Sequence, residues 1–149
     1  MYCGIDPGKK GGIALIKDGK IIGTSPMLVN YEINQYLLEA SNMAQNGTIY
    51  VIEKVGSMPG QGVASMFKFG FNTGYLYGCL HTLKQKVVEV SPLQWKKHFG
   101  IPGKKKDPIE CKTKTIQAVC QRYPEMSTAK YDSGIFDAIL IATYHIETP

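Results

Sequence analysis

Residues 2–16 read YCGIDPGKKGGIALI, and two apolar runs in this stretch flank a turn of Pro, Gly and Lys. Short apolar runs bounded by glycines are typical of β-strands, so the stretch predicts a hairpin with strands at 2–6 and 12–16. Asp6 closes the first of these strands. A buried strand has no use for a carboxylate, which is poorly solvated there, so Asp6 is the first candidate functional residue.

The chain continues as alternating strand and helix patterns. The turn at 17–20, KDGK, predicts a third antiparallel strand at 21–24. A helical pattern follows from Asn30, its expected cap, to about residue 44, and TIYVIEKV at 48–55 predicts a fourth strand. Because a helix connects them, the fourth strand is expected to lie parallel to the first.

The second half predicts one more strand and four helices. We expect a helix from Val63 to about Gln85, a strand at 86–90, a short helix from Pro92, a helix from Pro108 to about Arg122, and a last helix within FDAILIATYHI at 136–146. The order predicts one α/β domain over residues 1–149, built on a five-stranded mixed sheet. Three antiparallel strands come first, two parallel strands follow, and helices flank them.

Composition excludes several protein classes. The 149 residues are 44% hydrophobic, yet no apolar stretch approaches the roughly 18 residues of a membrane span, and no signal peptide is apparent. We therefore expect a soluble, cytoplasmic protein. The four cysteines lack C-x-x-C or zinc-type spacing, which favours reduced packing thiols. A metal ion would have to be held by oxygen.

The net charge of +5 arises from one segment. Seven lysines face only two acids between residues 96 and 114, and basic and acidic residues cancel over the rest of the chain. A charge run can be a solvated face, but a single basic block on an otherwise neutral surface favours binding of a polyanion such as nucleic acid. The lysines are Lys96, Lys97, Lys104, Lys105, Lys106, Lys112 and Lys114.

Four carboxylates are candidates for one site. Asp6 and Glu53 each end a strand that the predicted order places side by side, and Asp132 and Asp137 lie near the start of the last helix. Ligands of open α/β sheets gather at the carboxyl ends of strands, and carboxylates without His or Cys suit Mg²⁺ or Mn²⁺. The alternatives are a turn cap at Asp6, a lysine partner for Glu53, and helix N-terminal acids at Asp132 and Asp137.

Four motifs in order resemble the RuvC-type Holliday junction resolvases, most closely their bacteriophage branch. They are GIDPGKKGGIAL, IEKVGSMPGQGVASMFKFG, SPLQWKK and YDSGIFDAILIA, and together they span nearly the whole chain. The resemblance implies an RNase H-like fold, a homodimer in the cytoplasm of a bacterial host, and two Mg²⁺ ions that cut symmetric strands of a four-way DNA junction during recombination and repair. It assigns metal binding to Asp6, Glu53 and Asp137.

The chain departs from the family at two positions. Relatives carry an acid or His three or four residues before the final Asp, where this chain has Ser133 and Gly134, so Asp132 is predicted as either the fourth ligand or a helix cap. Cellular members carry an aromatic wedge three residues after the Glu, where this chain has Gly56, and Met58 is the candidate replacement.

The predicted mechanism is two-metal hydrolysis, with Asp6 bridging both ions. Lys104, Lys105, Lys106, Lys112 and Lys114 would neutralise DNA phosphates without reading bases. Two alternatives stay open, namely another RNase H-like nuclease acting on flaps or RNA/DNA hybrids, and a junction-binding protein that does not cut.

A glycine repeat indicates close approach of another backbone. Gly70, Gly74 and Gly78 recur every four residues within a predicted helix, beside the aromatic stripe Phe67, Phe71 and Tyr75. Glycine destabilises a helix interior, so three in register suggest packing against a neighbour. That neighbour is either the domain's own sheet or a second copy of the chain.

Overall fold

The computed structural model describes residues 1–29, 31–44, 46–56, 60, 62–103 and 107–149. The strands are β1 (Tyr2–Asp6), β2 (Gly12–Lys17), β3 (Lys20–Pro26), β4 (Ile49–Glu53) and β5 (Lys86–Val90). The helices are α1 (Tyr31–Asn42), α2 (Val63–Thr82), α3 (Pro92–His98), α4 (Pro108–Arg122) and α5 (Ser133–Glu147), with a 3₁₀ helix, η1 (Pro124–Thr128), after α4. The predicted order of elements is confirmed. The 3₁₀ turn is an addition, and the expected cap Asn30 lies outside the described residues.

The five strands form one mixed sheet in the order β3-β2-β1-β4-β5. β2 pairs antiparallel with β1 and β3, whereas β4 pairs parallel with β1 and β5, as predicted. The β2–β3 turn uses left-handed backbone at Asp18 and Gly19, a conformation that an Asp-Gly pair tolerates well. The sheet therefore places the parallel strands β1 and β4 next to each other in its interior.

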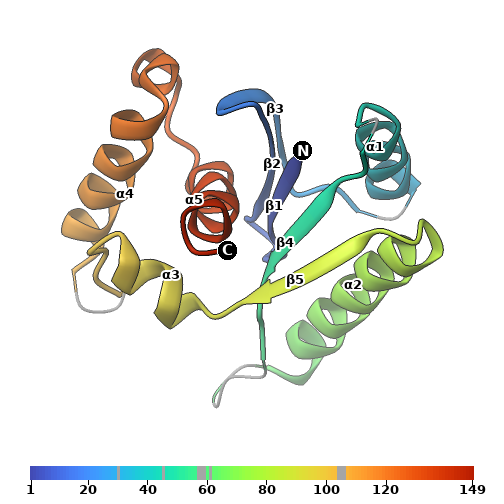
Figure 1. Cartoon of the computed structure of the whole chain (residues 1–149). Helices are drawn as coiled ribbons and strands as arrows, with labels where there is room; N and C mark the ends of the chain where they lie inside the picture. Colours follow the sequence, from blue (N-terminus) through green and yellow to red (C-terminus); the bar gives the residue numbers. More distant parts are fainter. Residues whose placement is uncertain (30, 45, 57–59, 61, 104–106) are drawn as a thin grey trace.

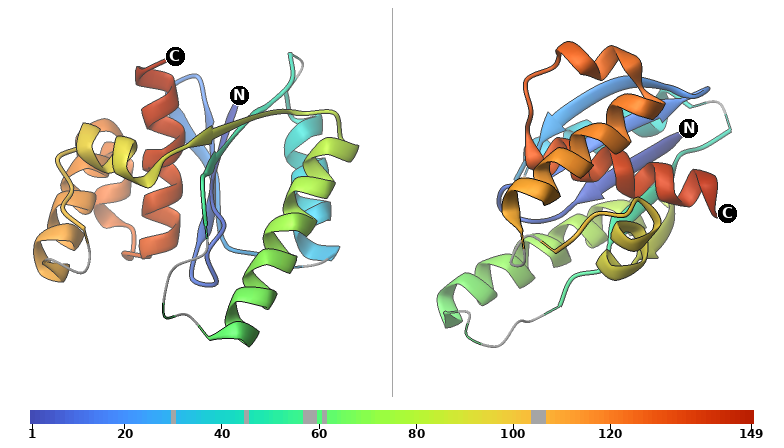
Figure 2. Two further views of the ribbon diagram at one scale, coloured as in Figure 1. Left: turned by 90° about the horizontal axis from the view of Figure 1, so that it is seen from below. Right: turned by 90° about the vertical axis from the view of Figure 1, so that its left-hand side faces the viewer.

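Helices cover both faces of the sheet (Figure 1). α1 and α2 lie on one face, and α3, α4 and α5 lie on the other, with α5 directly against the strands (Figure 2). Each interface has its own buried cluster, one built around Leu37, Ile52 and Leu80 and the other around Trp95 and Ile139. Because helices cover both faces of the sheet, the central strands are apolar on both faces.

Glycines allow α5 to lie unusually close to the sheet. A Cβ added at Gly4 of β1 would overlap the carbonyl oxygen of Ala138, and one at Gly134 would overlap the backbone of Lys10 and Gly11. Any side chain at these positions would push the helix outward. The close approach brings the first turns of α5 to the β1–β2 loop, where Asp6 ends its strand.

The four cysteines are free thiols, as their spacing predicts, with Cys3 and Cys111 buried and Cys79 and Cys120 half-buried. They take part in packing and form no disulfide. Within the described ranges, no helix is long and apolar enough to cross a membrane.

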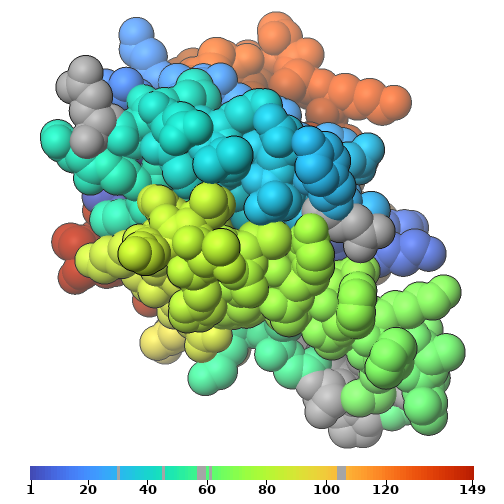
Figure 3. All heavy atoms as spheres, turned by 90° about the vertical axis from the view of Figure 1, so that its right-hand side faces the viewer, coloured from blue at the N-terminus to red at the C-terminus, as the bar shows by residue number. Residues whose placement is uncertain are grey.

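Helix α2 docks through its C-terminal half only. Its buried residues are Leu76 and Leu80, and no described residue of the helix before them is buried. Figure 3 shows α1 and α2 side by side on this face, with the N-terminal end of α2 projecting beyond α1. The sheet therefore supports the second half of α2 and leaves the first half standing away from the core.

The glycine repeat of α2 does not pack on the sheet. A Cβ added at Gly70, Gly74 or Gly78 would meet no atom of the described chain within 4 Å. Along the same side, Phe67 is 73% exposed and Phe71 is 59% exposed. Packing against the domain's own sheet, one of the two predicted explanations of the repeat, is therefore wrong.

Candidate active site

Two carboxylates end the adjacent parallel strands β1 and β4. In the register of this pair, Ile5 lies opposite Ile52, so that Asp6 and Glu53 follow at the same edge of the sheet. Both are the last residues of their strands. The parallel pairing thus delivers two acids to one place, as the order of elements predicted.

The third carboxylate comes from α5. Asp137 is only 5% exposed, and its helix packs across β1 and β2. The negative charges of Asp6 and Asp137 both act on Glu53, which places each of them within electrostatic reach of Glu53. The structure therefore brings together Asp6, Glu53 and Asp137, although they are far apart in the sequence.

Burial is the main reason why the pKa of Glu53 lies above its usual range, and the charges of Asp6 and Asp137 push it in the same direction. Two groups act against this. Trp95 stabilises the charged form through a hydrogen bond, and Lys96 does so through its positive charge. Glu53 is thus a carboxylate in an environment that would favour a bound cation.

The Glu53 side chain is fixed by Trp95. The indole Nε1 donates a hydrogen bond of 2.9 Å to Glu53 Oε1, and the Trp95 ring is completely buried in the core beneath α3. Pro92 occupies the first turn of α3, which suits a residue without a backbone N–H. A rigid core residue therefore holds one oxygen of a half-buried acid at the sheet edge.

Asp6 is oriented by the loop that follows it. The backbone N–H of Gly8 donates to Asp6 Oδ1 at 3.1 Å. This is the turn-capping contact that stood as the alternative to a ligand role. It occupies one carboxylate oxygen and fixes the side chain at the end of β1, so the two roles are compatible.

Asp132 caps α5. Its Oδ1 accepts hydrogen bonds from the backbone N–H groups of Gly134 and Ile135, each at 3.0 Å. The structure thus places Asp132 in the capping role, one of the two roles predicted for it. A ligand role for Asp132 stays a prediction.

The chemistry of the carboxylate set fits a hard divalent cation. The charges of Asp6 and Asp137 raise the pKa of Glu53, so a positive ion would stabilise the charged form of this set. Carboxylate oxygen is also the donor that Mg²⁺ and Mn²⁺ prefer. Among the described residues, no three His, Cys, Asp or Glu side chains already converge on one coordination centre. The residues therefore supply suitable donors at one edge, but not a closed coordination shell.

Part of the basic segment lies beside this edge. Lys96 Nζ stands 5.0 Å from the centre of the Trp95 ring, and Lys112 Nζ stands 5.0 Å from the ring of Tyr131, the residue before Asp132. Lys114, in contrast, is half-buried on α4 in a hollow that His98 and Arg122 also line. The predicted DNA contacts Lys104, Lys105 and Lys106, and the wedge candidate Met58, lie outside the described residues.

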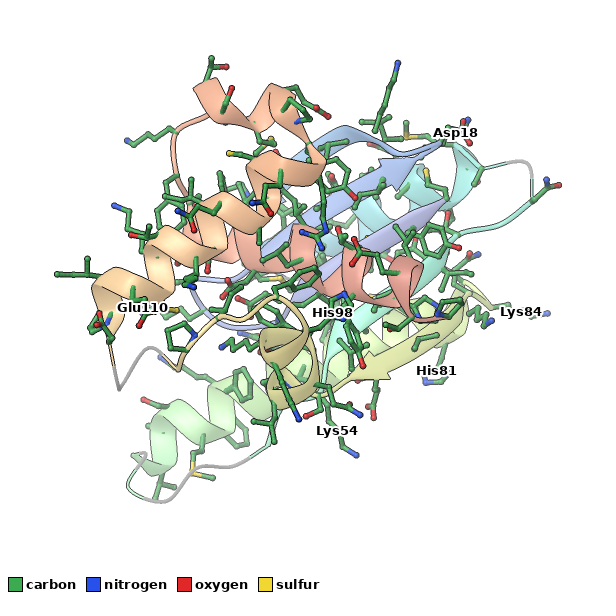
Figure 4. The ribbon with its side chains drawn as sticks, turned by 60° about the vertical axis from the view of Figure 1, so that its left-hand side comes forward. Asp18, Lys54, His81, Lys84, His98 and Glu110 are labelled. Atoms are coloured by element: carbon green, nitrogen blue, oxygen red, sulfur yellow. The ribbon has the colours of Figure 1, made fainter. Side chains whose placement is uncertain are left out.

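A separate ionic cluster ties the three helices of this face together. His98 of α3, labelled in Figure 4, and Arg122 of α4 both contact the carboxylate of Glu147 at the end of α5, and His98 Nε2 lies 2.6 Å from a carboxylate oxygen. The hydrogen bonds from Arg122 and His98 lower the pKa of Glu147. These contacts hold α3 and α4 against α5, which in turn positions Trp95 and Asp137.

Sequence reasoning missed two contributions to the site. Trp95 appeared only as a residue of the short helix, and its partner Glu53 lies 42 positions earlier. Gly134 appeared as a missing acid, whereas the structure gives the reason for the glycine: a Cβ there would overlap the β1–β2 loop. For Trp95, the only signal in the sequence was an isolated Trp in a lysine-rich helix. For Gly134, the only signal was a glycine near the start of a helix.

The fold itself is known from solved structures. The Thermus thermophilus RuvC structure aligns with a TM-score of 0.67 over 97% of this chain and 92% of that one, at 17% identity. The chain has an RNase H-like fold. T. thermophilus RuvC in complex with a Holliday junction substrate aligns with a TM-score of 0.65 over the same shares of both chains, at 15% identity. The RuvC-like fold predicted from the four motifs is confirmed.

A viral protein shares this RNase H-like architecture. Fowlpox virus resolvase, in a complex with substrate Holliday junction DNA, aligns with a TM-score of 0.56 over the full length of both chains, at 13% identity. No protein-family model and no curated protein matches the sequence. At these identities the likeness establishes the fold.

Proposed function

We propose that this protein is a structure-selective DNA endonuclease that cuts Holliday junctions and related branched DNA by divalent-metal-dependent hydrolysis. The observation that carries the proposal is the shared field of three carboxylates, in which Asp6 and Asp137 help to raise the pKa of Glu53. A sheet edge with a purely structural role does not need several carboxylates close together. The RNase H-like fold, which also occurs in resolvases solved with junction DNA, supports the choice of substrate.

Asp6, Glu53 and Asp137 would hold two Mg²⁺ ions, and Mn²⁺ would substitute. When bound, such ions lower the pKa of a bound water and stabilise charge on the attacking and leaving oxygens. Glu53 is aimed by Trp95, and Asp6 is aimed by the Gly8 amide. Asp132 is proposed as a fourth acid, and would have to use the oxygen that does not cap α5.

The basic segment would hold the DNA backbone. Lys96 on α3 and Lys112 on α4 would neutralise phosphates beside the carboxylate edge without reading bases, and Lys114, in the hollow beside His98 and Arg122, would extend the same basic surface. The same role is proposed for Lys104, Lys105 and Lys106. A DNA strand that approaches three acids needs these positive charges, because phosphate and carboxylate repel each other.

A homodimer would cover the outer side of α2. Val63 is 86% exposed and continues the stripe of Phe67 and Phe71, and the glycines between them leave the helix backbone open to close approach. Exposed apolar stripes of this kind mark interaction surfaces. Two copies would present two carboxylate edges to the two symmetric strands of a four-way junction.

The setting proposed for this activity is DNA recombination and repair in the cytoplasm of a bacterial host, with the chain belonging to the bacteriophage branch of RuvC-type resolvases. The four sequence motifs carry this assignment. It adds a biological context to the chemistry and changes none of the residue roles.

The test is cleavage of end-labelled four-way junction, flap, duplex and RNA/DNA hybrid side by side in Mg²⁺. We expect symmetric cuts in the junction and little cutting of duplex. Asp6→Asn should abolish cleavage and keep junction binding. Preferred cutting of flap or hybrid would favour another RNase H-like nuclease, and binding without any cutting would favour a non-cleaving junction protein.

A further inference from the structure

A cavity of about 600 Å³ lies between α2 and the β1–β2 loop, on the face of the sheet opposite α5. One wall is the inner side of α2, and the other is formed by the loop after β1, the segment after β3 and the start of α1. Pockets that hold small organic ligands have volumes of this order. The cavity exists because only the second half of α2 docks on the sheet, as the burial of Leu76 and Leu80 indicates.

The lining combines three kinds of group. Lys9 and Lys68 supply positive charge, and no Asp or Glu stands among the described residues that line the cavity. Phe69 and Tyr75 supply aromatic rings, while Asn72 supplies an amide that can both donate and accept hydrogen bonds. An anion, a flat aromatic ring and polar ring edges are the features of a nucleotide, and aromatic stacking with nearby cations is how proteins hold unpaired bases.

The cavity adjoins the candidate active site. Its wall includes Pro7 and Gly8, and the Gly8 amide is hydrogen-bonded to Asp6. The cavity therefore begins at the residues that directly follow Asp6, beside the carboxylate edge. A base pair cannot enter a pocket of this kind, but the branch point of a junction supplies bases that are unpaired or easily unpaired.

We propose that this cavity receives one unpaired nucleotide of the branched DNA, adjacent to the phosphate at the carboxylate edge. The inference rests on the proposed function and adds the structural feature by which a branch point is selected over duplex. Lys9 and Lys68 contact the phosphate of this nucleotide, Phe69 stacks on its base, and Asn72 bonds to the base edge. Duplex DNA offers no unpaired base, so it gains nothing from the cavity.

The test uses four-way junctions that carry 2-aminopurine at single positions around the branch point, mixed with protein in EDTA so that no strand is cut. We expect a change in 2-aminopurine fluorescence at one or two positions only. Asn72→Trp, which fills the cavity, should abolish the change, whereas Glu39→Trp, which places the same ring on exposed α1 outside the cavity, should not.

An abasic site at the responding position gives a second readout. It should weaken binding by wild-type protein about fivefold or more, as expected when one stacked base is removed, and should leave binding by Asn72→Trp unchanged. The cavity proposal would be overturned if wild type and Asn72→Trp gave the same change in 2-aminopurine fluorescence and lost the same amount of binding affinity at the abasic site. Junction cleavage without a fluorescence response would also overturn it and leave the proposed function intact. A response without cleavage in Mg²⁺ would overturn the nuclease and leave the cavity proposal intact.

Discussion

Trp95 and Glu53 are joined by a 2.9 Å hydrogen bond from the indole Nε1 to the carboxylate Oε1, across 42 residues of sequence. The indole is fully buried and the carboxylate stands at the sheet edge, so the bond connects the core of the protein to the candidate site. Hydrogen bonds to charged groups contribute about 1.5–3 kcal/mol, more than bonds between neutral groups. Trp95 is therefore a positioning residue for Glu53.

Replacing Trp95 by Phe should raise the pKa of Glu53 further, because the substitution keeps an aromatic ring in the core and removes the donor that favours the charged form. The measurement is an NMR titration of the Glu53 carboxyl carbon in metal-free protein. Tyr77→Phe is the matched control, since it removes a hydroxyl bonded to Glu89 on the same sheet. An unchanged Glu53 titration in Trp95→Phe would contradict the positioning role.

Glu53→Gln should stabilise the metal-free protein at neutral pH. The folded-state pKa of Glu53 lies above its ordinary value of 4.5, so the folded state holds the proton more tightly than the unfolded state does. That contribution to stability is present at low pH and is lost as pH rises through the folded-state pKa. The measurement is urea unfolding in EDTA at a series of pH values from below 4.5 upward. The unfolding free energy of wild type should fall with rising pH relative to that of Glu53→Gln. Parallel curves of unfolding free energy against pH for the two proteins would refute the raised pKa of Glu53.

Asp132 can be tested by a pair of substitutions that separate capping from metal binding. Asp132→Ala should cost about 1 kcal/mol of unfolding free energy, because it removes the cap of α5, whereas Asn caps about as well as Asp. If Asp132 also binds metal, Asp132→Asn should fold normally and lose orders of magnitude in cleavage rate at saturating Mg²⁺. Near-normal cleavage by Asp132→Asn would reduce the proposed site to three carboxylates.

Neutralising Lys96, Lys112 and Lys114 together should weaken binding to all DNA forms alike. The slope of log affinity against log salt should fall by about 0.9 for each phosphate that the protein no longer neutralises on duplex DNA. The control is the double substitution of Lys17 and Lys20, which lie at the β2–β3 turn. A salt slope that the triple variant shares with wild type would make the basic segment a solvated face.

Gly74→Ala should show whether the outer side of α2 is a dimer interface or a solvent-exposed helix face. Within one chain the added methyl meets no described atom, and Ala stabilises a helix interior by about 1 kcal/mol relative to Gly. If the outer side of α2 contacts a second copy closely, the same methyl should weaken the dimer, as measured by sedimentation. Ser65→Ala, on the cavity side of α2, should leave the dimer unchanged. A more stable protein of unaltered mass would exclude this stripe as the interface.

The sequence by itself determined the order of elements, the mixed sheet and the meeting of Asp6 and Glu53 at one edge. These features follow from local patterns: a strand shows in a handful of neighbouring residues, and a helical connection makes β1 and β4 parallel. Once two parallel neighbours each end in an acid, their carboxylates must share an edge. The RuvC-like fold was predicted on a different ground, the resemblance of four motifs in order to the RuvC-type resolvases.

Only the tertiary structure decided which groups touch across elements. The bond from Trp95 to Glu53, the capping role of Asp132 and the outward face of the α2 glycines depend on how helices dock, and docking depends on whole buried surfaces rather than on neighbours along the chain. Gly134 illustrates the difference. In the sequence it stands where the resolvases that the motifs resemble carry an acid. In the structure its lack of a side chain lets α5 carry Asp137 to the sheet edge, because a side chain there would overlap the β1–β2 loop.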